Sequence, residues 1–253
     1  MNIQGSTVLV TGGASGLGKA VIQRFHSLGA NVVIVDLNQE LGEALAQQTN
    51  GLFIQADVSN DQDAYRIFEL AQQKFGKVQI LVNCAGIGTP AKVIGRDGKA
   101  SPLQDFSRIV QINLIGTFNL IAKFAEQLHA TDSDGSERGV VINTASVAAF
   151  DGQIGQPAYA ASKAGVVGMT LPLAREFARY RIRVMTIAPG LFKTPLLAGL
   201  PQEAQDSLGQ QVPFPSRLGE PEEFAQLVES IVNNPMLNGE VIRLDGAIRM
   251  AAK

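Results

Sequence analysis

A tyrosine and a lysine four residues apart carry the clearest chemical signal in the sequence. On a helix, Tyr159 and Lys163 lie on one face with neighbouring side chains. A free tyrosine, with a pKa of about 10, is a poor base at neutral pH, but an adjacent ammonium stabilises the phenolate. Ser146 lies thirteen residues upstream, after a predicted strand, where it can hold a substrate oxygen beside the phenol. Most Tyr-x3-Lys pairs are solvated helix surface, so this prediction of an acid/base site depends on the remaining motifs.

The turn after the first predicted strand, residues 11–20, reads TGGASGLGKA. Glycines let a backbone turn tightly and approach a pyrophosphate, and the start of the following helix supplies free N–H groups, so the turn predicts a phosphate site. One interpretation is the Walker A loop of a phosphohydrolase, because Gly13, Gly18 and Lys19 match most of that pattern. Ala20 stands where the hydroxyl that ligates Mg²⁺ should be, which argues against this interpretation.

Gly12, Gly16 and Gly18 favour a dinucleotide-binding turn, although their spacing departs from the standard G-x-G-x-x-G fingerprint. Asp36 ends the second predicted strand, where its carboxylate can accept hydrogen bonds from both adenosine ribose hydroxyls. Because this carboxylate repels a 2′-phosphate and the next residue, Leu37, cannot neutralise it, the sequence favours NAD over NADP. The alternative interpretation of Asp36 is a helix cap.

Short apolar runs alternate with helical patterns along the whole chain. Seven of these runs predict strands, at residues 8–10, 32–35, 52–54, 80–82, 140–142, 184–187 and 241–244. Continuous runs are typical of strands that are buried on both faces. The alternation predicts a Rossmann-type α/β fold: a doubly wound parallel sheet of about seven strands with helices on both faces. Since no linker or repeat divides the chain, residues 1–253 are expected to form one domain. Ser59 with Gln62 predicts a capping box where the helix after the third strand begins.

Composition excludes several functional classes. The chain has 253 residues with 21 basic and 23 acidic side chains, and its formal net charge of −2 gives no attraction to nucleic acid or anionic membrane. The one cysteine, Cys84, excludes a disulfide scaffold and indicates a reducing compartment. His26 and His129 are isolated, and no spacing resembles a metal site, so no metal is expected.

The low charged fraction bears on assembly. Only 17% of the residues are charged, below the ~25% of typical soluble domains, which predicts surface covered by oligomer contacts. No apolar run reaches the ~18 residues of a membrane span, and the first strand begins too close to Met1 for a cleavable leader. We therefore expect a bacterial cytoplasmic protein, with the mitochondrial matrix as the alternative.

Taken together, these motifs resemble the short-chain dehydrogenase/reductase family over essentially the whole chain. The matching motifs are Thr11-Gly12-x3-Gly16-x-Gly18, Asp57, Asn83-Cys84-Ala85-Gly86, Asn113, Ser146, Tyr159-x3-Lys163 and Pro189-Gly190. The resemblance implies that Tyr159 is the general acid/base and that Ser146 orients the reacting oxygen. It also implies that Lys163 lowers the tyrosine pKa and binds the nicotinamide ribose, while Asn113 holds a water that relays the proton.

The resemblance further implies a set of cofactor-binding residues and a homotetramer, the latter strengthened by the apolar tail 247–252. The expected NAD-binding residues are Gly12, Ser15, Gly16, Leu17, Gly18, Asp36, Asp57, Val58, Cys84, Ala85, Gly86, Tyr159, Lys163, Phe192 and Thr194. In this set Asp57 and Val58 would lie at the adenine, and Phe192 and Thr194 near the nicotinamide carboxamide.

Longer segments resemble the members of this family that act on 3-hydroxyacyl-CoA. These segments are residues 143–150, 183–192, 212–219 and 238–250. They imply reversible, NAD-dependent oxidation of the 3-hydroxyl of a 3-hydroxyacyl-CoA, with Ser146, Gln153 and Tyr159 at the substrate. The extended loop 88–101 carries three cations that can meet coenzyme A phosphates: Lys92, Arg96 and Lys99. Three alternatives remain open: an acetoacetyl-CoA or 3-ketoacyl reductase, a hydroxysteroid dehydrogenase, and a non-catalytic dinucleotide-binding scaffold subunit.

Overall fold

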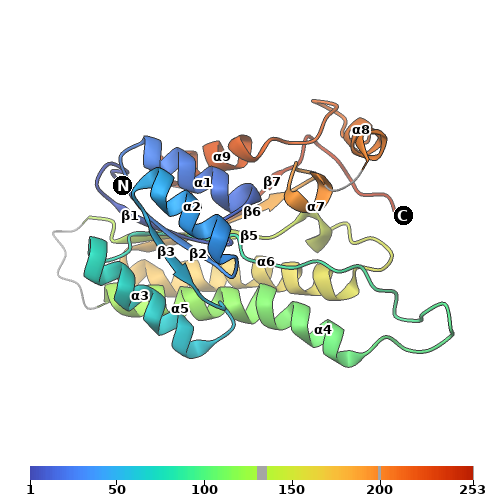
Figure 1. Cartoon of the computed structure of the whole chain (residues 1–253), viewed down its shortest axis with the longest axis horizontal. Helices are drawn as coiled ribbons and strands as arrows, with labels where there is room; N and C mark the ends of the chain where they lie inside the picture. The colour runs from blue at the N-terminus through green and yellow to red at the C-terminus, as the bar shows by residue number, and fades with distance from the viewer. Residues whose placement is uncertain (130–135, 199–200, 253) are drawn as a thin grey trace.

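Seven parallel strands form one central sheet in the computed structural model, which describes residues 1–129, 136–198 and 201–252 (Figure 1). The strands are β1 (Thr7–Thr11), β2 (Asn31–Asp36), β3 (Leu52–Gln55), β4 (Ile80–Asn83), β5 (Gly139–Thr144), β6 (Ile182–Pro189) and β7 (Val241–Leu244). Their order across the sheet is β3-β2-β1-β4-β5-β6-β7, and every neighbouring pair is parallel. The predicted Rossmann-type fold is confirmed.

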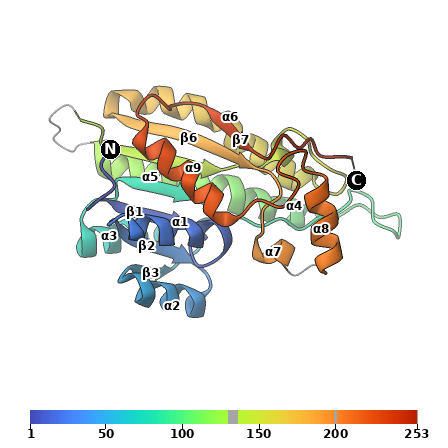
Figure 2. The same cartoon turned by 90° about the horizontal axis from the view of Figure 1, so that it is seen from above.

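Helices cover both faces of this sheet (Figures 1 and 2). One face carries α1 (Gly16–Ser27), α2 (Gln39–Thr49) and α9 (Pro221–Asn233). The other carries α3 (Asp61–Phe75), α4 (Leu103–Val110), α5 (Thr117–His129) and α6 (Pro157–Phe177), with the π-helical turn η1 (Gln111–Gly116) joining α4 to α5. Two short helices, α7 (Pro195–Ala198) and α8 (Gln202–Gln210), lie beyond the end of β6. Within the described residues, none of the helices combines the length and apolar character that crossing a membrane requires.

Two hydrophobic cores sandwich the sheet, and successive strand residues alternate between them. In β1, Val8 and Val10 pack into the core under α1 and α9, whereas Leu9 packs into the core under α3, α5 and α6. Phe25 and Phe124 are the large side chains that fill the two cores, and both are fully buried. Successive residues in the strands inside the sheet therefore meet one core or the other, which explains the continuous apolar runs in the sequence.

The chain reverses its direction of travel across the sheet at β1, which lies between β2 and β4. In open α/β sheets, ligands bind at the carboxyl ends of the strands beside such a switch point, because the flanking loops leave a crevice there. The loops after β1, β4, β5 and β6 all begin at this edge.

One expected helix cap is wrong. Helix α3 is capped by Asn60, whose side chain accepts a hydrogen bond from the Asp63 N–H at 3.0 Å, and not by Ser59. The Ser59 hydroxyl instead donates to Asp57 at 2.7 Å. The helix begins one residue later than the pattern indicates, because Asp57 already engages the serine in a turn.

Candidate active site

Tyr159, Lys163 and Ser146 meet at the carboxyl edge of the sheet, as their spacing predicts. The first two lie in the first turns of α6, and Ser146 follows β5 at the start of the short 3₁₀ helix η2 (Val147–Ala149). The Ser146 hydroxyl lies beside the Tyr159 side chain, and Lys163 Nζ lies 5.8 Å from the centre of the Tyr159 ring. A phenol, a hydroxyl and an ammonium therefore converge on one point.

Burial changes the acidity of this group. Burial raises the pKa of Tyr159, and its hydrogen bond with Ser146 acts in the opposite direction. Burial also lowers the pKa of Lys163 to about 8, since the side chain is only 5% exposed. Among the described residues the ammonium donates only to the Thr144 carbonyl, at 2.8 Å, so two of its three N–H donors remain for a ligand. Sequence reasoning missed Thr144, because a backbone acceptor carries no side-chain signal.

Asn113 holds a loop of the protein with its side chain. It lies in η1 and is fully buried; Oδ1 accepts from the Ile87 N–H, and Nδ2 donates to the Ile87 carbonyl and to Ser162. The Asn113 carbonyl accepts the Thr117 hydroxyl at 2.7 Å. Both N–H groups of the Asn113 amide are thus bonded within the protein, so the residue can meet a water only through an acceptor oxygen.

The glycine-rich turn is packed too closely for side chains. Gly12 has φ +62°, and a Cβ there would lie 2.9 Å from the Ala85 backbone. A Cβ at Gly18 would lie 2.2 Å from the Gly12 carbonyl oxygen. This close packing brings the backbone N–H groups at the start of α1 to the carboxyl ends of β1 and β4, a setting in which helix N-termini bind a pyrophosphate. Ser15 makes no side-chain cap hydrogen bond, and Leu17 packs on the core, so the first offers a hydroxyl and the second only its backbone.

Asp36 is fixed at the end of β2 by two backbone N–H groups. Its Oδ2 accepts from Ala14 at 3.1 Å and its Oδ1 accepts from Asn38 at 3.0 Å. An ionised carboxylate accepts about four hydrogen bonds, so each oxygen keeps capacity for one more donor. This oriented carboxylate beside the glycine turn fits a pair of ribose hydroxyls, and the turn and the carboxylate together fit NAD.

Residues 57–59, expected at the adenine, are held in place by hydrogen bonds to side chains. Asp57 Oδ1 accepts from both the N–H and the hydroxyl of Ser59. The Val58 carbonyl accepts from Nδ2 of Asn119, a buried residue of α5, at 3.0 Å. Asn119 was missed, and its signal is an amide within an otherwise apolar helical stretch.

Residues 84–86 contact both the strand that leads into the glycine turn and the catalytic Lys163. The Ala85 N–H donates to the Thr11 hydroxyl at 3.1 Å, and a Cβ at Gly86 would lie 3.4 Å from Lys163 Nζ. Burial raises the pKa of Cys84 to about 11, which keeps its thiol neutral at physiological pH.

The two residues expected near the nicotinamide carboxamide differ in the groups that they have available for binding it. Phe192 is 6% exposed and packs against Gly219, so only its backbone is available. Thr194 lies opposite Gly16, where a Cβ would be 3.8 Å from the threonine side chain.

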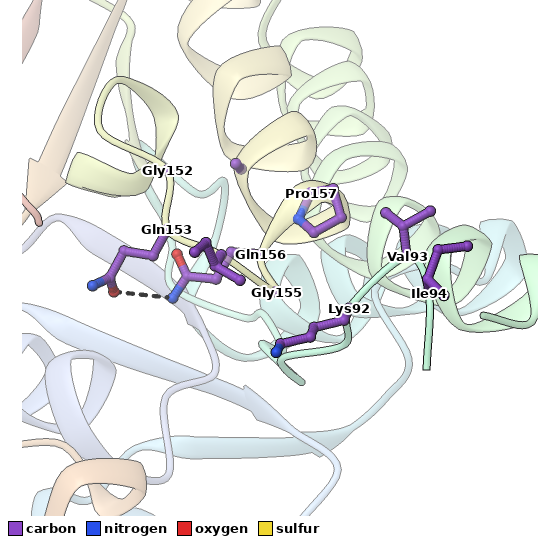
Figure 3. Close-up of a pocket in the computed structure, with 10 residues that line it drawn as sticks. Lys92, Val93, Ile94, Gly152, Gln153, Gly155, Gln156 and Pro157 are labelled. Carbon is purple, nitrogen blue, oxygen red and sulfur yellow. Dashed lines mark hydrogen bonds between the residues drawn. The ribbon is translucent and has the colours of Figure 1, made fainter. Parts of the chain in front are cut away.

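A pocket of about 470 Å³ (Figure 3) has in its wall Ala160, the residue that follows Tyr159 in α6. Its wall comes from residues 92–94 and 152–157 with Ala160, and it includes Gln153. Three apolar side chains of this wall are more than half exposed: Val93, Ile94 and Ile154. Of the three cations of the loop, Lys92 lines the pocket; Arg96 and Lys99 lie on a small hairpin closed by the Ile94–Ala100 bridge. In the part of the chain that the structure describes, no cluster of three or more His, Cys, Asp or Glu side chains is arranged to hold a metal ion.

Comparisons with known proteins agree with this geometry. The family model described as short chain dehydrogenase matches residues 6–205. The chain is 53% identical to 3-hydroxyacyl-CoA dehydrogenase type-2 of Homo sapiens, over 98% of this chain and 97% of the relative. The crystal structure of 3-hydroxyacyl-CoA dehydrogenase type-2 from Mycobacterium avium has a TM-score of 0.94 at 40% identity and covers 98% of both chains. That of 3-ketoacyl-(acyl-carrier-protein) reductase from Brucella melitensis complexed with NADH has a TM-score of 0.87 at 31% identity, covering 98% of this chain and all of that one.

Proposed function

The chain belongs to the short-chain dehydrogenase family, and from this premise we propose that it catalyses the reversible NAD-dependent oxidation of a 3-hydroxyacyl-CoA to the 3-ketoacyl-CoA. The observation that carries the proposal is the convergence of Ser146, Tyr159 and Lys163 between the glycine turn and the apolar pocket. The relatives from Homo sapiens and Mycobacterium avium carry 3-hydroxyacyl-CoA dehydrogenase in their names.

Tyr159 acts as the general base in the oxidation. Its phenolate takes the proton from the 3-hydroxyl while the Ser146 hydroxyl donates a hydrogen bond to the same substrate oxygen, which holds C3 in one orientation. A buried phenolate alone is unfavourable, and the nearby Lys163 ammonium stabilises it by pairing opposite charges. NAD, when bound, supplies the hydride acceptor for C3.

The cofactor is held by groups that the fold brings to one edge. The N–H groups at the start of α1 face the pyrophosphate, Asp36 accepts from the ribose hydroxyls, and Asp57 and Val58 flank the adenine. Repulsion between Asp36 and a 2′-phosphate selects NAD over NADP, which argues against an NADPH-dependent reductase.

The pocket wall suits a thioester with a long, anionic carrier. Exposed Val93, Ile94 and Ile154 offer apolar contacts for an acyl chain or pantetheine arm. Lys92 at the pocket, with Arg96 and Lys99 farther along the same loop, meets the phosphates of coenzyme A. A hydroxysteroid would use the apolar wall without needing these cations.

We also propose that the chain, a single domain over residues 1–253, works as a homotetramer. The support is an apolar surface on α4 and α5, where Leu103, Phe106 and Phe118 are 73%, 41% and 49% exposed. Surfaces of this kind mark protein contacts. The single cysteine supports a reducing compartment, for which we propose the bacterial cytoplasm, with the mitochondrial matrix as the alternative.

One assay tests the function. NADH formation is measured with purified enzyme on 3-hydroxyacyl-CoA esters, hydroxysteroids and simple secondary alcohols. The expected result is the highest kcat/KM on a 3-hydroxyacyl-CoA. A higher kcat/KM on a steroid, or no turnover of any alcohol by folded enzyme, would overturn the proposal, the second result in favour of a scaffold role.

A further inference from the structure

The C-terminal segment 245–252 is hydrogen-bonded to the wall of the substrate pocket. The Gln153 amide Nε2 donates to the Ala251 carbonyl at 3.1 Å, and the Ile154 N–H donates to the Ala252 carbonyl at 3.0 Å. Gln153 and Ile154 both line the pocket. Two consecutive wall residues are thus held by two consecutive carbonyls of a segment almost a hundred residues away.

Arg243, at the end of β7, anchors this segment. Its guanidinium donates to Asp245 and to Asp151, each at 2.7 Å, and to the Ile248 carbonyl at 3.0 Å. Asp151 directly precedes the pocket wall, whereas Asp245 and Ile248 belong to the turn after β7. The guanidinium also lies 5.3 Å from the centre of the Phe150 ring. Because the side chains of both Arg243 and Asp151 are four-fifths buried, this ion pair is shielded from solvent and salt.

The turn after β7 sets the direction of the segment. Ala247 has φ +67°, an uncommon conformation for alanine, and it is held by donation of its N–H to Asp245 Oδ1 at 3.0 Å. Ile248 is 2% exposed and packs beside Gly190 in the loop after β6. Both contacts define the turn from which the chain crosses to the pocket.

The same segment orients two side-chain amides. Since Gln153 donates its Nε2 to Ala251, its Oε1 faces Gln156 and accepts from Gln156 Nε2 at 3.5 Å (Figure 3). That contact turns the Gln156 Oε1 away, and this buried oxygen has no hydrogen-bond partner among the described residues. A buried acceptor without a donor is costly, and Gln156 lies three residues before Tyr159.

We propose that segment 245–252, anchored by Arg243, is a positioning strap for the substrate site. The strap holds loop 151–156 in place, so that Gln153 and Ile154 keep their positions in the pocket wall. On the proposed function, on which the ligand's identity rests, this wall contacts the acyl-CoA. Arg243 and Asp151 are positioning residues, since they act through the loop.

Isosteric substitutions in the full-length enzyme test the strap. Asp151→Asn and Arg243→Gln each break the ion pair, and Gln153→Glu removes the donor to Ala251 while keeping the acceptor for Gln156. Arg24→Gln is the matched control, because it breaks a part-buried ion pair with Glu229 that joins α1 to α9, outside the strap and the pocket wall. The readouts are KM and kcat on acyl-CoA, KM for NAD, and hydrogen exchange of the Ile154 amide.

Each strap variant is expected to raise KM for acyl-CoA about tenfold, with KM for NAD unchanged and kcat within about twofold. Exchange of the Ile154 amide is expected to accelerate at least tenfold. The double variant Asp151→Asn/Arg243→Gln should resemble Arg243→Gln alone, because that change already breaks the pair with Asp151. Arg24→Gln should match the wild type in every readout.

Unchanged KM and unchanged Ile154 exchange in folded Asp151→Asn would overturn the strap. If Arg243→Gln does not fold, Asp151→Asn and Gln153→Glu decide the question. If the wild-type enzyme turns over no acyl-CoA, the proposed function fails, but Ile154 exchange needs no substrate and still decides whether the strap exists.

Discussion

The Asn113 side chain closes two hydrogen bonds on the backbone of Ile87. Its Oδ1 accepts from the Ile87 N–H and its Nδ2 donates to the Ile87 carbonyl, each at 2.8 Å. The amide therefore acts as a neighbouring strand would, and it holds the loop after β4 where Gly86 lies against Lys163. This contact makes Asn113 a positioning residue for the cofactor-side loop as well as a neighbour of the catalytic group.

Asp36→Ala is expected to weaken the binding of NAD and to remove the charge repulsion that disfavours NADP. The carboxylate would make charge-assisted hydrogen bonds of roughly 1.5 to 3 kcal/mol each, so kcat/KM with NAD should fall at least about tenfold. Glu40→Ala, which removes the same charge from the exposed first turn of α2, is the control. A wild-type enzyme with higher kcat/KM for NADP would contradict the assignment.

Tyr159→Phe keeps the ring and removes the proton carrier. The variant should fold and bind NADH, measured by fluorescence titration, but lose about 10² to 10⁴ in kcat, the usual contribution of general acid/base catalysis. Tyr65→Phe, a change of a half-exposed tyrosine on α3, should be silent. Near-normal turnover by Tyr159→Phe would show that another group carries the proton.

The buried Lys163 makes the stability of the cofactor-free protein depend on pH. Its pKa is about 8 in the folded chain and 10.5 ordinarily, so the unfolded state binds more protons between these values. The free energy of unfolding should gain roughly 3 kcal/mol from this residue as the pH rises from about 8 to 10.5, and lose it on return. Urea denaturation of wild type against Lys163→Met isolates the effect, with Lys74→Met as an exposed control. If the free energy of unfolding depended on pH in the same way for wild type and Lys163→Met, this prediction would be refuted.

The three cations of loop 88–101 should bind the coenzyme A part of the substrate and not its acyl group. Neutralising Lys92, Arg96 and Lys99 together should raise KM for acetoacetyl-CoA far more than for an acetoacetyl ester of a simple thiol. Because charges at an exposed loop are screened, the difference should shrink with added salt. The control neutralises three exposed cations elsewhere: Lys74, Arg175 and Arg179. An equal rise in KM for both substrates would contradict the proposed contact between these cations and coenzyme A.

Sedimentation at low micromolar concentration should show a tetramer. Phe118→Glu places a charge in the exposed apolar surface of α4 and α5 and should yield smaller species. Leu41→Glu on α2, with the same 49% exposure, should leave the assembly intact. A stable wild-type monomer would remove the explanation for the low charged fraction.

Local features of the fold and the site could be predicted because they depend on residues close in sequence. Apolar runs such as Val32 to Val35 predict buried strands, since side chains on both faces of such a strand meet a core. Tyr159 and Lys163 share a helix face because they are four residues apart. The glycines of the turn predict that its backbone comes close to another backbone or a ligand. For the same reason the family is recognisable from its motifs.

Contacts between loops were decided only by the tertiary structure. Asp36 meets Ala14 because β1 and β2 are parallel neighbours, and Lys163 finds a backbone carbonyl that no side-chain pattern marks. Asn113 bonds its amide to the Ile87 backbone, a partner that no sequence motif marks. Arg243 reaches Asp151 across 92 positions of sequence. Periodicity reports which face of an element is apolar, whereas a hydrogen bond between two loops depends on where the sheet order brings their ends.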